Sequence, residues 1–331
     1  MITSFMRLLV LLFLSIVISS GVYAETIEVE PGTDTLQTAI DAASNGDTLQ
    51  LSEGTYKGDI NFSGKSITIK GLGIQSIIRG TGNLAAVIFN SNEGFSSLLD
   101  QVAITGGKRA GAVLINGASP RINRSWIISN KAIGAGSGVY VYAKDDDGNS
   151  PSFFNNIIVT NKTKLPKLGN NAYSIYIEDS SPSFINNTIA FNQNSAVLIT
   201  GNSSPRFTNN IIGFSGKKKS RAIKFSGYNL SSSPQFDYNL FYKNKFDVEV
   251  SGAKYKTFDD FIDAGVLTSA TFNGNVLGNP KFMKAKRLDL RLKEGSAAID
   301  AGNPDDIYND LLDNSRNDIG ASGGIFINPN L

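Results

Sequence analysis

The chain has 331 residues, of which 41% are hydrophobic, and its 31 basic and 29 acidic side chains give a formal net charge of +2. It contains no cysteine and no histidine, which excludes disulfides, thiolate metal sites and every catalytic arrangement built on histidine. The near balance of charge does not indicate a nucleic-acid partner.

The first 24 residues are typical of a secretory signal peptide. Arg7 is the only charged residue among them, an apolar run covers residues 8–18, and Val22, Tyr23 and Ala24 end the segment in a small-x-small pattern. No later stretch reaches the roughly 20 apolar residues of a transmembrane helix. We therefore expect an exported protein, secreted, periplasmic or at the cell surface, without a transmembrane anchor.

Five similar segments follow one another through the middle of the chain. They begin at Ser-Pro pairs whose serines are Ser119, Ser150, Ser181, Ser204 and Ser233, and their starts are 31, 31, 23 and 29 residues apart. Most continue with a phenylalanine, an asparagine pair and an aliphatic pair. A constant motif with spacers of variable length indicates a repeated structural turn that carries loops of different size.

A short β-like run precedes each Ser-Pro pair, at residues 112–115, 139–142, 174–177, 196–199 and 222–225. Each repeat therefore predicts strand, turn, strand, turn and strand, with no room for a helix. Winding every repeat in the same sense stacks Val139, Ile175, Val197 and Ile223 inside. The same winding places Asn156, Asn187, Asn210 and Asn239 one per turn, about 4.8 Å apart, where their side-chain amides can bond to one another.

In these features the chain resembles the pectate-lyase-like superfamily of right-handed parallel β-helices, over residues 26–245. Residues 36–43, residues 45–49 and the Gly54-Thr55-Tyr56 turn are similar to the N-terminal cap of that family, in which an amphipathic helix covers the first turn. The resemblance implies an all-β solenoid with this capping helix and a less regular C-terminal cap. The expected divisions are a signal peptide (1–24), an N-terminal cap (25–57), β-helix turns (58–245) and a C-terminal helix with a capping module (246–331).

The C-terminal region differs in texture from the repeats. Residues 257–266 predict a short N-capped helix. The segments 278–282, 288–292, 296–302 and 318–321 resemble a terminal module found on many secreted bacterial β-helix proteins, although Asn279-Pro280 and Ser296-Ala297 replace the Asp-Pro and Ser-Pro that are usual there. That resemblance implies a closing cap without catalytic function.

Strand alternation predicts which side chains face outward beside the inward row. The two outward rows are Leu114, Tyr140, Tyr176, Leu198 and Lys224, and Asn116, Tyr142, Glu178, Thr200 and Ser226. Stacked tyrosines offer flat apolar area with a polar tip, which suits sugar rings, so Tyr140, Tyr142 and Tyr176 are the candidate substrate-binding residues. The alternative is an aromatic ladder that only stabilises the sheet.

Candidate catalytic residues are few. A glycoside hydrolase needs two opposed carboxylates, and Glu178, with Asp179 and the acidic run 145–147 one turn away, is the only source on this face. A polysaccharide lyase needs a base and a positive group, for which Lys224 and Arg221, beside the lysine run 217–219, are the candidates. The acidic and basic runs are equally explained as solvated loops. If the protein is an enzyme, the sequence favours a lyase over a hydrolase.

Calcium takes several oxygen ligands, and the acidic residues 145–147 or Asp300, Asp305 and Asp306 could supply them. No spacing among these residues forms a calcium motif. We therefore predict no metal and no cofactor. The leading functional prediction is an exported, monomeric β-helix protein that binds a polysaccharide or cell-surface glycan, whether or not it also processes that glycan. Two different functions are also compatible with the sequence, namely a non-catalytic structural or adhesive protein and a lyase acting on an acidic polysaccharide.

Overall fold

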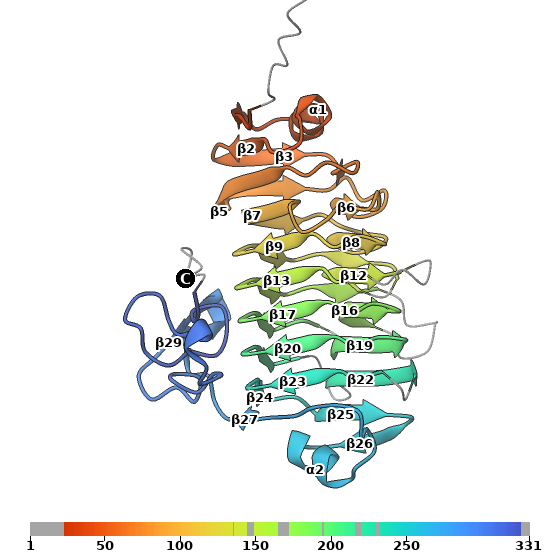
Figure 1. Ribbon diagram of the computed structural model, residues 1–331, viewed down its shortest axis with the longest axis vertical. Helices are drawn as coiled ribbons and strands as arrows, with labels where there is room; N and C mark the ends of the chain where they lie inside the picture. The colour runs from red at the N-terminus through yellow and green to blue at the C-terminus, as the bar shows by residue number, and fades with distance from the viewer. Residues whose placement is uncertain are drawn as a thin grey trace, which may run out of the picture.

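The computed structural model describes residues 23–134, 136–143, 149–164, 172–193, 195–215, 220–229 and 232–325. These residues form a parallel β-helix, in which short strands wind into successive turns that stack on one another (Figure 1). Helices α1 and α2 lie at its opposite ends. The all-β solenoid predicted from the repeat is confirmed.

The N-terminal end is closed by α1 (Thr35–Ala42) with β1 (Thr26–Val29), β2 (Thr48–Leu51) and β3 (Gly54–Lys57). Helix α1 buries Leu36 and Ile40 in the main hydrophobic core. The Lys65 ammonium donates to the carbonyls of Ile40, Asp41 and Ala43 at 2.6 to 2.7 Å, so it satisfies carbonyls that the end of a helix leaves without partners. The expected capping helix is confirmed, and it protects an edge that could otherwise pair with another chain.

The first of three walls is a nine-stranded sheet, parallel except for its last pair. Its row of Val113, Val139, Ile175, Val197 and Ile223 is in register and fully buried, as predicted. Its strands are β4 (Ile60–Asn61), β6 (Val87–Phe89), β8 (Val113–Asn116), β12 (Val139–Tyr142), β16 (Tyr173–Glu178), β19 (Ser195–Gly201), β22 (Arg221–Tyr228), β25 (Phe246–Val250) and β26 (Ala253–Tyr255).

The other two walls belong to one 16-stranded sheet, and β7 (Leu98–Thr105) pairs with strands of both. β5 (Thr68–Arg79) pairs alongside β7. The second wall, here called the phenylalanine wall, consists of β9 (Arg121–Asn123), β13 (Ser152–Phe154), β17 (Ser183–Ile185), β20 (Arg206–Thr208) and β23 (Gln235–Asp237). The third, here called the isoleucine wall, consists of β10 (Trp126–Ile128), β14 (Ile157–Val159), β18 (Thr188–Ala190), β21 (Ile211–Gly213), β24 (Leu240–Tyr242) and β27 (Val276–Leu277).

Each of these walls sends one continuous stack of side chains into the core. In the phenylalanine wall the rings of Phe153, Phe184 and Phe207 stack with centroids 4.4 and 4.8 Å apart. In the isoleucine wall the predicted inward row is confirmed, because it is in register and no member is more than 2% exposed; it contains Ile127, Ile158, Ile189, Ile212 and Phe241. Each buried aliphatic side chain contributes roughly 1.5 to 3 kcal/mol.

The predicted asparagine ladder lies at the bend between these two walls. Asn156, Asn187 and Asn210 are fully buried, and each side-chain amide donates to the next side-chain carbonyl at 2.9 to 3.0 Å. A second ladder, which was not predicted from the sequence, follows the isoleucine wall, where the Asn130 amide donates to Asn161 at 3.0 Å and that of Asn161 to Asn192 at 3.2 Å.

The C-terminal end is closed by α2 (Phe258–Asp263) and the β25–β26 hairpin. Thr257 begins α2 with a capping box, in which its side chain accepts from the Asp260 amide and its own amide donates to the Asp260 carboxylate. Phe258 stacks on Phe241 with ring centroids 4.5 Å apart, which covers the end of the inward stack. The N-capped helix predicted for this region is confirmed.

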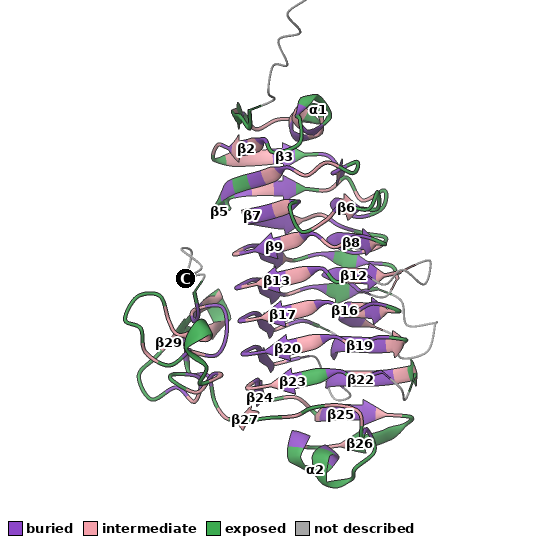
Figure 2. Ribbon diagram, viewed as in Figure 1, coloured by how far each residue is buried: buried purple, intermediate pink, exposed green. Residues whose placement is uncertain are grey.

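Residues 279–325, here called the C-terminal module, lie along the isoleucine wall and not over the end of the solenoid (Figure 1). The module contains β28 (Phe282–Lys284), η1 (Ala285–Arg287), β29 (Asp289–Leu292) and η2 (Asp306–Tyr308). Phe282, Leu290 and Ile319 pack in one buried cluster with Ile157 and Ile211 of the wall. The outer loops of the module are largely exposed (Figure 2). The cap implied by the resemblance therefore covers a flank, while α2 covers the end.

Candidate functional site

The outward face of the nine-stranded sheet carries the predicted row in register. Tyr140 pairs with Leu114 on one side and with Tyr176 on the other, and Leu198 and Lys224 continue the row. The second row also starts as predicted, because Asn116, Tyr142, Glu178 and Thr200 are in register. Ser226 departs from it, since the pairing of β19 with β22 shifts between Ile199 and Gly201.

The tyrosines of this face lie against one another. The rings of Tyr140 and Tyr176 stack with centroids 4.9 Å apart and an interplanar angle of 17°, and those of Tyr140 and Tyr142 stack at 4.9 Å and 28°. Each ring is half-buried. Because the ring faces are largely used within this cluster, the geometry fits a stabilising aromatic ladder at least as well as a sugar platform. The substrate-binding role predicted for the three residues stays a prediction.

Glu178 lies beside the tyrosines and accepts a hydrogen bond from the Tyr140 hydroxyl at 2.9 Å. Burial, and then this hydrogen bond, raise the pKa of Tyr140 above its ordinary value. Burial, and then the charge of Glu178, raise the pKa of Tyr176 to about 12. Both hydroxyls are therefore neutral donors at physiological pH. A catalytic role for Glu178 would compete with the hydrogen bond from Tyr140.

The two predicted basic groups share one buried carboxylate. Arg221 donates through Nε to Glu249, and the Lys224 ammonium lies 3.3 Å from the other oxygen of Glu249. Glu249 is 4% exposed and Arg221 is 6% exposed. The expectation that Arg221 lies on the open face is corrected, because a carboxylate buried at this depth needs charged partners and holds the guanidinium there. Lys224 is on the predicted face, and its catalytic role stays a prediction.

The remaining predicted sites are not brought into a common centre. The acidic run 145–147, the lysine run 217–219 and residues 1–22 lie outside the described residues. Asp300 and Asp305 are exposed and belong to turns, where Asp305 accepts from the Ile307 amide. Within the described ranges, no three histidine, cysteine, aspartate or glutamate side chains are placed to hold a metal ion.

A groove of about 300 Å³ lies where the isoleucine wall turns toward the nine-stranded sheet. Four exposed cations line it, namely Arg79, Lys108, Lys131 and Lys164, and we call it the basic groove. Its remaining lining consists of Thr105, Gly106, Gly107, Ser129 and Ile133. No acidic residue of the described chain lines it, and none of its four cations forms an ion pair with a described residue.

The position of three lysines follows from the second asparagine ladder. β11 (Lys131–Ala132) pairs in parallel with β15 (Lys162–Thr163), so Lys131 and Lys162 are directly adjacent in neighbouring turns. The backbone N–H of Gly107 donates to the side-chain oxygen of Asn130, and the backbone N–H of Asn130 donates in the same way to the side-chain oxygen of Asn161. Gly107 is therefore the equivalent of Asn130 one turn earlier, which places Lys108 in the same column as Lys131. Aligning the turns on Asn130 and Asn161 would have revealed this column, whereas alignment on the Ser-Pro motif hides it.

Neither helix in the described part of the chain has the length and apolar character needed to cross a bilayer. No protein-family model matches the chain, and no curated protein matches its sequence.

Comparison with solved structures finds polysaccharide lyases. The pectate lyase Pel9A has a TM-score of 0.49 and 13% identity over 91% of this chain and 97% of its own. An alginate lyase from Paenibacillus sp. strain FPU-7 has a TM-score of 0.39 and 16% identity, and the match covers 69% of this chain and 91% of that enzyme. A mannuronic acid specific family 6 polysaccharide lyase from human gut microbiota has a TM-score of 0.37 and 15% identity, and the match covers 77% of this chain and 76% of that enzyme. At such identities the likeness concerns the fold alone, and the strand pairing of this chain shows by itself the parallel β-helix that the repeat predicts.

Proposed function

We propose that the protein is exported and binds an anionic polysaccharide in the basic groove. The observation that carries this proposal is the set of four exposed cations, Arg79, Lys108, Lys131 and Lys164, around one cavity whose described lining has no acidic side chain. A repeating polyanion places its charges along a line, as successive turns of the solenoid place the lysines.

The lysine column is unfavourable for the free protein. Lys131 and Lys162 are in-register neighbours, so their backbones lie about 4.8 Å apart, and like charges in directly paired positions destabilise a sheet. Exposed lysines also discourage the pairing of a strand edge with another chain, and this is a sufficient explanation for a single exposed lysine. Lys108 and Lys131 of this column converge with Arg79 and Lys164 on the basic groove, which is better explained by an anionic ligand that relieves the repulsion when it binds.

The lining of the groove also limits what chemistry it could perform. Glycosidic hydrolysis needs two carboxyl groups, on the order of 5 to 9.5 Å apart, and the described lining supplies none. Elimination from a uronate needs a base and a cation near the carboxylate, and lysine and arginine side chains supply these groups. We therefore propose binding as the primary function, and of the two reactions the described lining of the groove fits β-elimination better than hydrolysis.

The test uses the protein from Glu25 onward with polygalacturonate, alginate and uncharged dextran. We expect both uronates to bind and dextran not to bind, with affinity that falls as salt rises. The double variant Lys131→Ala/Lys164→Ala should bind the uronates about 2- to 30-fold more weakly, because each exposed charge pair contributes roughly 0.2 to 1 kcal/mol. Lys254→Ala, an exposed lysine on β26 in another wall, is the matched control.

Equal binding by the double variant and the control would refute the basic groove as the site. If Tyr176→Ala lost binding while the double variant kept it, the glycan site would be the outward face of the nine-stranded sheet. Ultraviolet absorbance of unsaturated sugar ends, followed in the same samples, tests elimination. Binding of single-stranded DNA as tightly as of the uronates would reduce the groove to a general polyanion site and contradict the proposal.

A further inference from the structure

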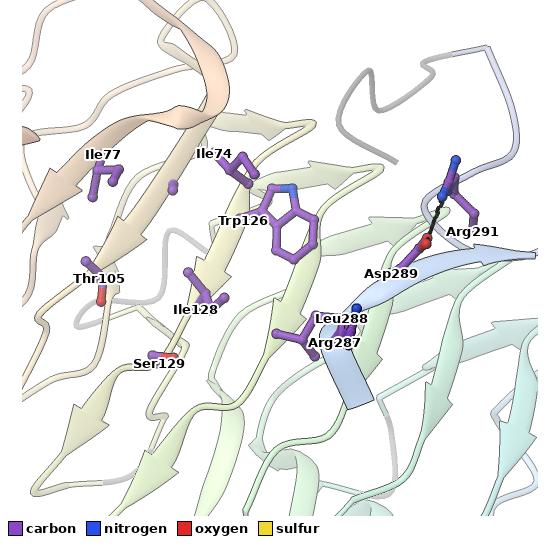
Figure 3. Close-up of a pocket in the computed structure, with 11 residues that line it drawn as sticks. Ile74, Ile77, Thr105, Trp126, Ile128, Ser129, Arg287, Leu288, Asp289 and Arg291 are labelled. Atoms are coloured by element: carbon purple, nitrogen blue, oxygen red, sulfur yellow. Dashed lines mark hydrogen bonds and ion pairs between the residues drawn. The ribbon is translucent and has the colours of Figure 1, made fainter. Parts of the chain in front are cut away.

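A second cavity, of about 560 Å³, adjoins the basic groove between the isoleucine wall and the C-terminal module (Figure 3). The two cavities share Thr105 and Ser129 in their linings, so they are parts of one continuous depression. We call the second one the apolar pocket. Its apolar lining consists of Ile74, Ile77, Ala103, Trp126, Ile128 and Leu288.

The wall side of the apolar pocket is a regular outward row. Ile77 pairs with Ala103, and Ala103 pairs with Trp126, so these three side chains lie side by side across β5, β7 and β10. In the later turns the same row continues with Ile157 and Ile211, which the module covers. Ala103 and Trp126 are only 5% and 6% exposed, so they form the floor of the apolar pocket, whereas Ile77 and Ile128 are partly exposed and Ile74 is exposed.

Two further features distinguish this pocket from ordinary surface. Ile74, which lines the pocket, comes from a stretch of β5 in which the pairing with β7 is irregular, and it is 50% exposed. The indole N–H of Trp126 is buried and has no hydrogen-bond partner among the described residues. Exposed large apolar groups beside a hollow are typical of binding sites, and a buried unpaired donor is uncommon.

Cations lie at both ends of the apolar pocket. The basic groove lies at one end, and Arg287 and Arg291 of the module line the other (Figure 3). Arg291 pairs with Asp289 through two hydrogen bonds of 2.7 and 2.8 Å, whereas Arg287 is exposed. A ligand that fills the whole depression would therefore combine an apolar part with anionic groups.

We propose that the apolar pocket binds an alkyl or acyl substituent carried by the acidic saccharide whose anionic groups bind the basic groove. This inference rests on the proposed function, because the saccharide supplies the anchor in the basic groove. It adds a substrate class: acidic glycans with hydrophobic substituents bind more tightly than unsubstituted ones. Cavities of roughly 300 to 1,000 Å³ are the size at which proteins hold small ligands.

Four small ligands test this pairing of features: octyl glucuronide, methyl glucuronide, octyl glucoside and methyl glucoside, each used below its critical micelle concentration. Trp126 is the only tryptophan of the chain, so its fluorescence reports directly on the pocket. We expect octyl glucuronide to bind at least tenfold more tightly than methyl glucuronide, since burying two methylenes suffices for that gain. It should also bind more tightly than octyl glucoside and shift the Trp126 emission.

Variants separate the pocket from the groove. Ile74→Ser should reduce the advantage of octyl over methyl glucuronide at least threefold, whereas Leu312→Ser, which changes a side chain that is 83% exposed on the module, should leave it unchanged. Lys131→Ala/Lys164→Ala should weaken both glucuronides and keep their ratio. Equal affinity of octyl and methyl glucuronide would overturn the pocket and leave polygalacturonate binding intact. Equal affinity of octyl glucuronide and octyl glucoside would overturn the coupling to an anion.

Discussion

Replacement of Asn187 by leucine tests whether the asparagine ladder holds the turns together. Its amide group donates to the carbonyls of Phe153 and Ile185 and to the side chain of Asn210, at 2.9 to 3.2 Å. Its side-chain oxygen accepts from both the backbone and the side-chain N–H of Asn156, at 2.9 and 3.0 Å. One side chain therefore connects three successive turns.

The cost of Asn187→Leu follows from the groups that lose their partner. The Asn156 side chain keeps a bond of 2.7 Å to the Ile122 carbonyl, but the Asn156 backbone N–H loses the acceptor that it has in the native bend. Both asparagines are fully buried, so water cannot replace that acceptor. A buried donor left unsatisfied costs about 1 to 3 kcal/mol, and we expect a destabilisation of this size.

Asn275 offers a matched control at the end of the same ladder. It accepts from the backbone and side-chain N–H of Asn239 at 2.9 and 3.1 Å and donates to the Phe236 carbonyl at 2.7 Å, but it is only half-buried. Asn239 is fully buried, but Asn275 itself is partly exposed at the end of the ladder, so we expect water to replace the lost acceptor once leucine is there, and Asn275→Leu should cost less than about 1 kcal/mol. Urea unfolding followed by far-ultraviolet circular dichroism measures both, as a lower midpoint at unchanged slope. Equal costs for the two variants, or no cost for Asn187→Leu, would refute the reasoning.

Three further variants probe the core, the buried acid and the tyrosine cluster. Ile189→Ala, in the middle of the inward stack of the isoleucine wall, should lower the free energy of unfolding by about 2 to 5 kcal/mol in the same assay, and a loss below about 1 kcal/mol would argue against the tight stack. Burial raises the pKa of Asp247 to about 6, so the folded state favours the neutral form of this acid. The stability that the neutral acid contributes is fully present below about pH 4 and is lost as the pH rises through about 6. The free energy of unfolding of Asp247→Asn should therefore match that of the wild type near pH 4 and exceed it by about 1 to 3 kcal/mol at about pH 8. If the difference between the variant and the wild type were the same at both pH values, this sign would be contradicted. Tyr140→Phe removes the hydrogen bond to Glu178 and should cost about 0.5 to 1.5 kcal/mol; an unchanged midpoint would show that this bond adds nothing to the fold.

The sequence predicted the core because a solenoid repeats the same packing problem in every turn. Once the Ser-Pro motif set the register, residues at equal offsets had to stack, and Ile158, Ile189 and Ile212 do so. The buried asparagine of each pair was predicted for the same reason. These inferences needed only the spacing of the motif and the alternation of strand side chains.

Arg221 shows what the same reasoning could not supply. Its buried partner is Glu249, which lies one turn later in register with Lys224, beyond the last repeat that the sequence allowed us to align. The tyrosine row was placed correctly, but the sequence does not reveal that Tyr140 and Tyr176 occupy each other's ring faces. The apolar pocket was out of reach as well, because Leu288 is brought to Trp126 only when the C-terminal module folds back.

In the three repeats that carry an asparagine pair, the two asparagines have opposite roles. The second asparagine points inward into the ladder, while the first adopts a left-handed backbone and binds the module: Asn155 donates to the Gly323 carbonyl at 2.6 Å and Asn186 to the Asp318 carbonyl at 2.9 Å. One turn earlier, Arg124 has the same left-handed backbone, but its side chain pairs with Asp100.

Because Arg124 pairs with Asp100, it does not make the side-chain contact with the described part of the module that Asn155 and Asn186 make in the next two turns. Ala103 and Trp126 are 5% and 6% exposed and belong to the same buried cluster as Ile157 and Ile211, whereas Ile77 is partly exposed and Ile74 is 50% exposed beside them. The apolar surface at this turn is therefore accessible through the apolar pocket and not as an open row. The apolar pocket at this turn shares Thr105 and Ser129 with the basic groove, and this adjacency is what the proposed binding of an amphipathic acidic glycan depends on.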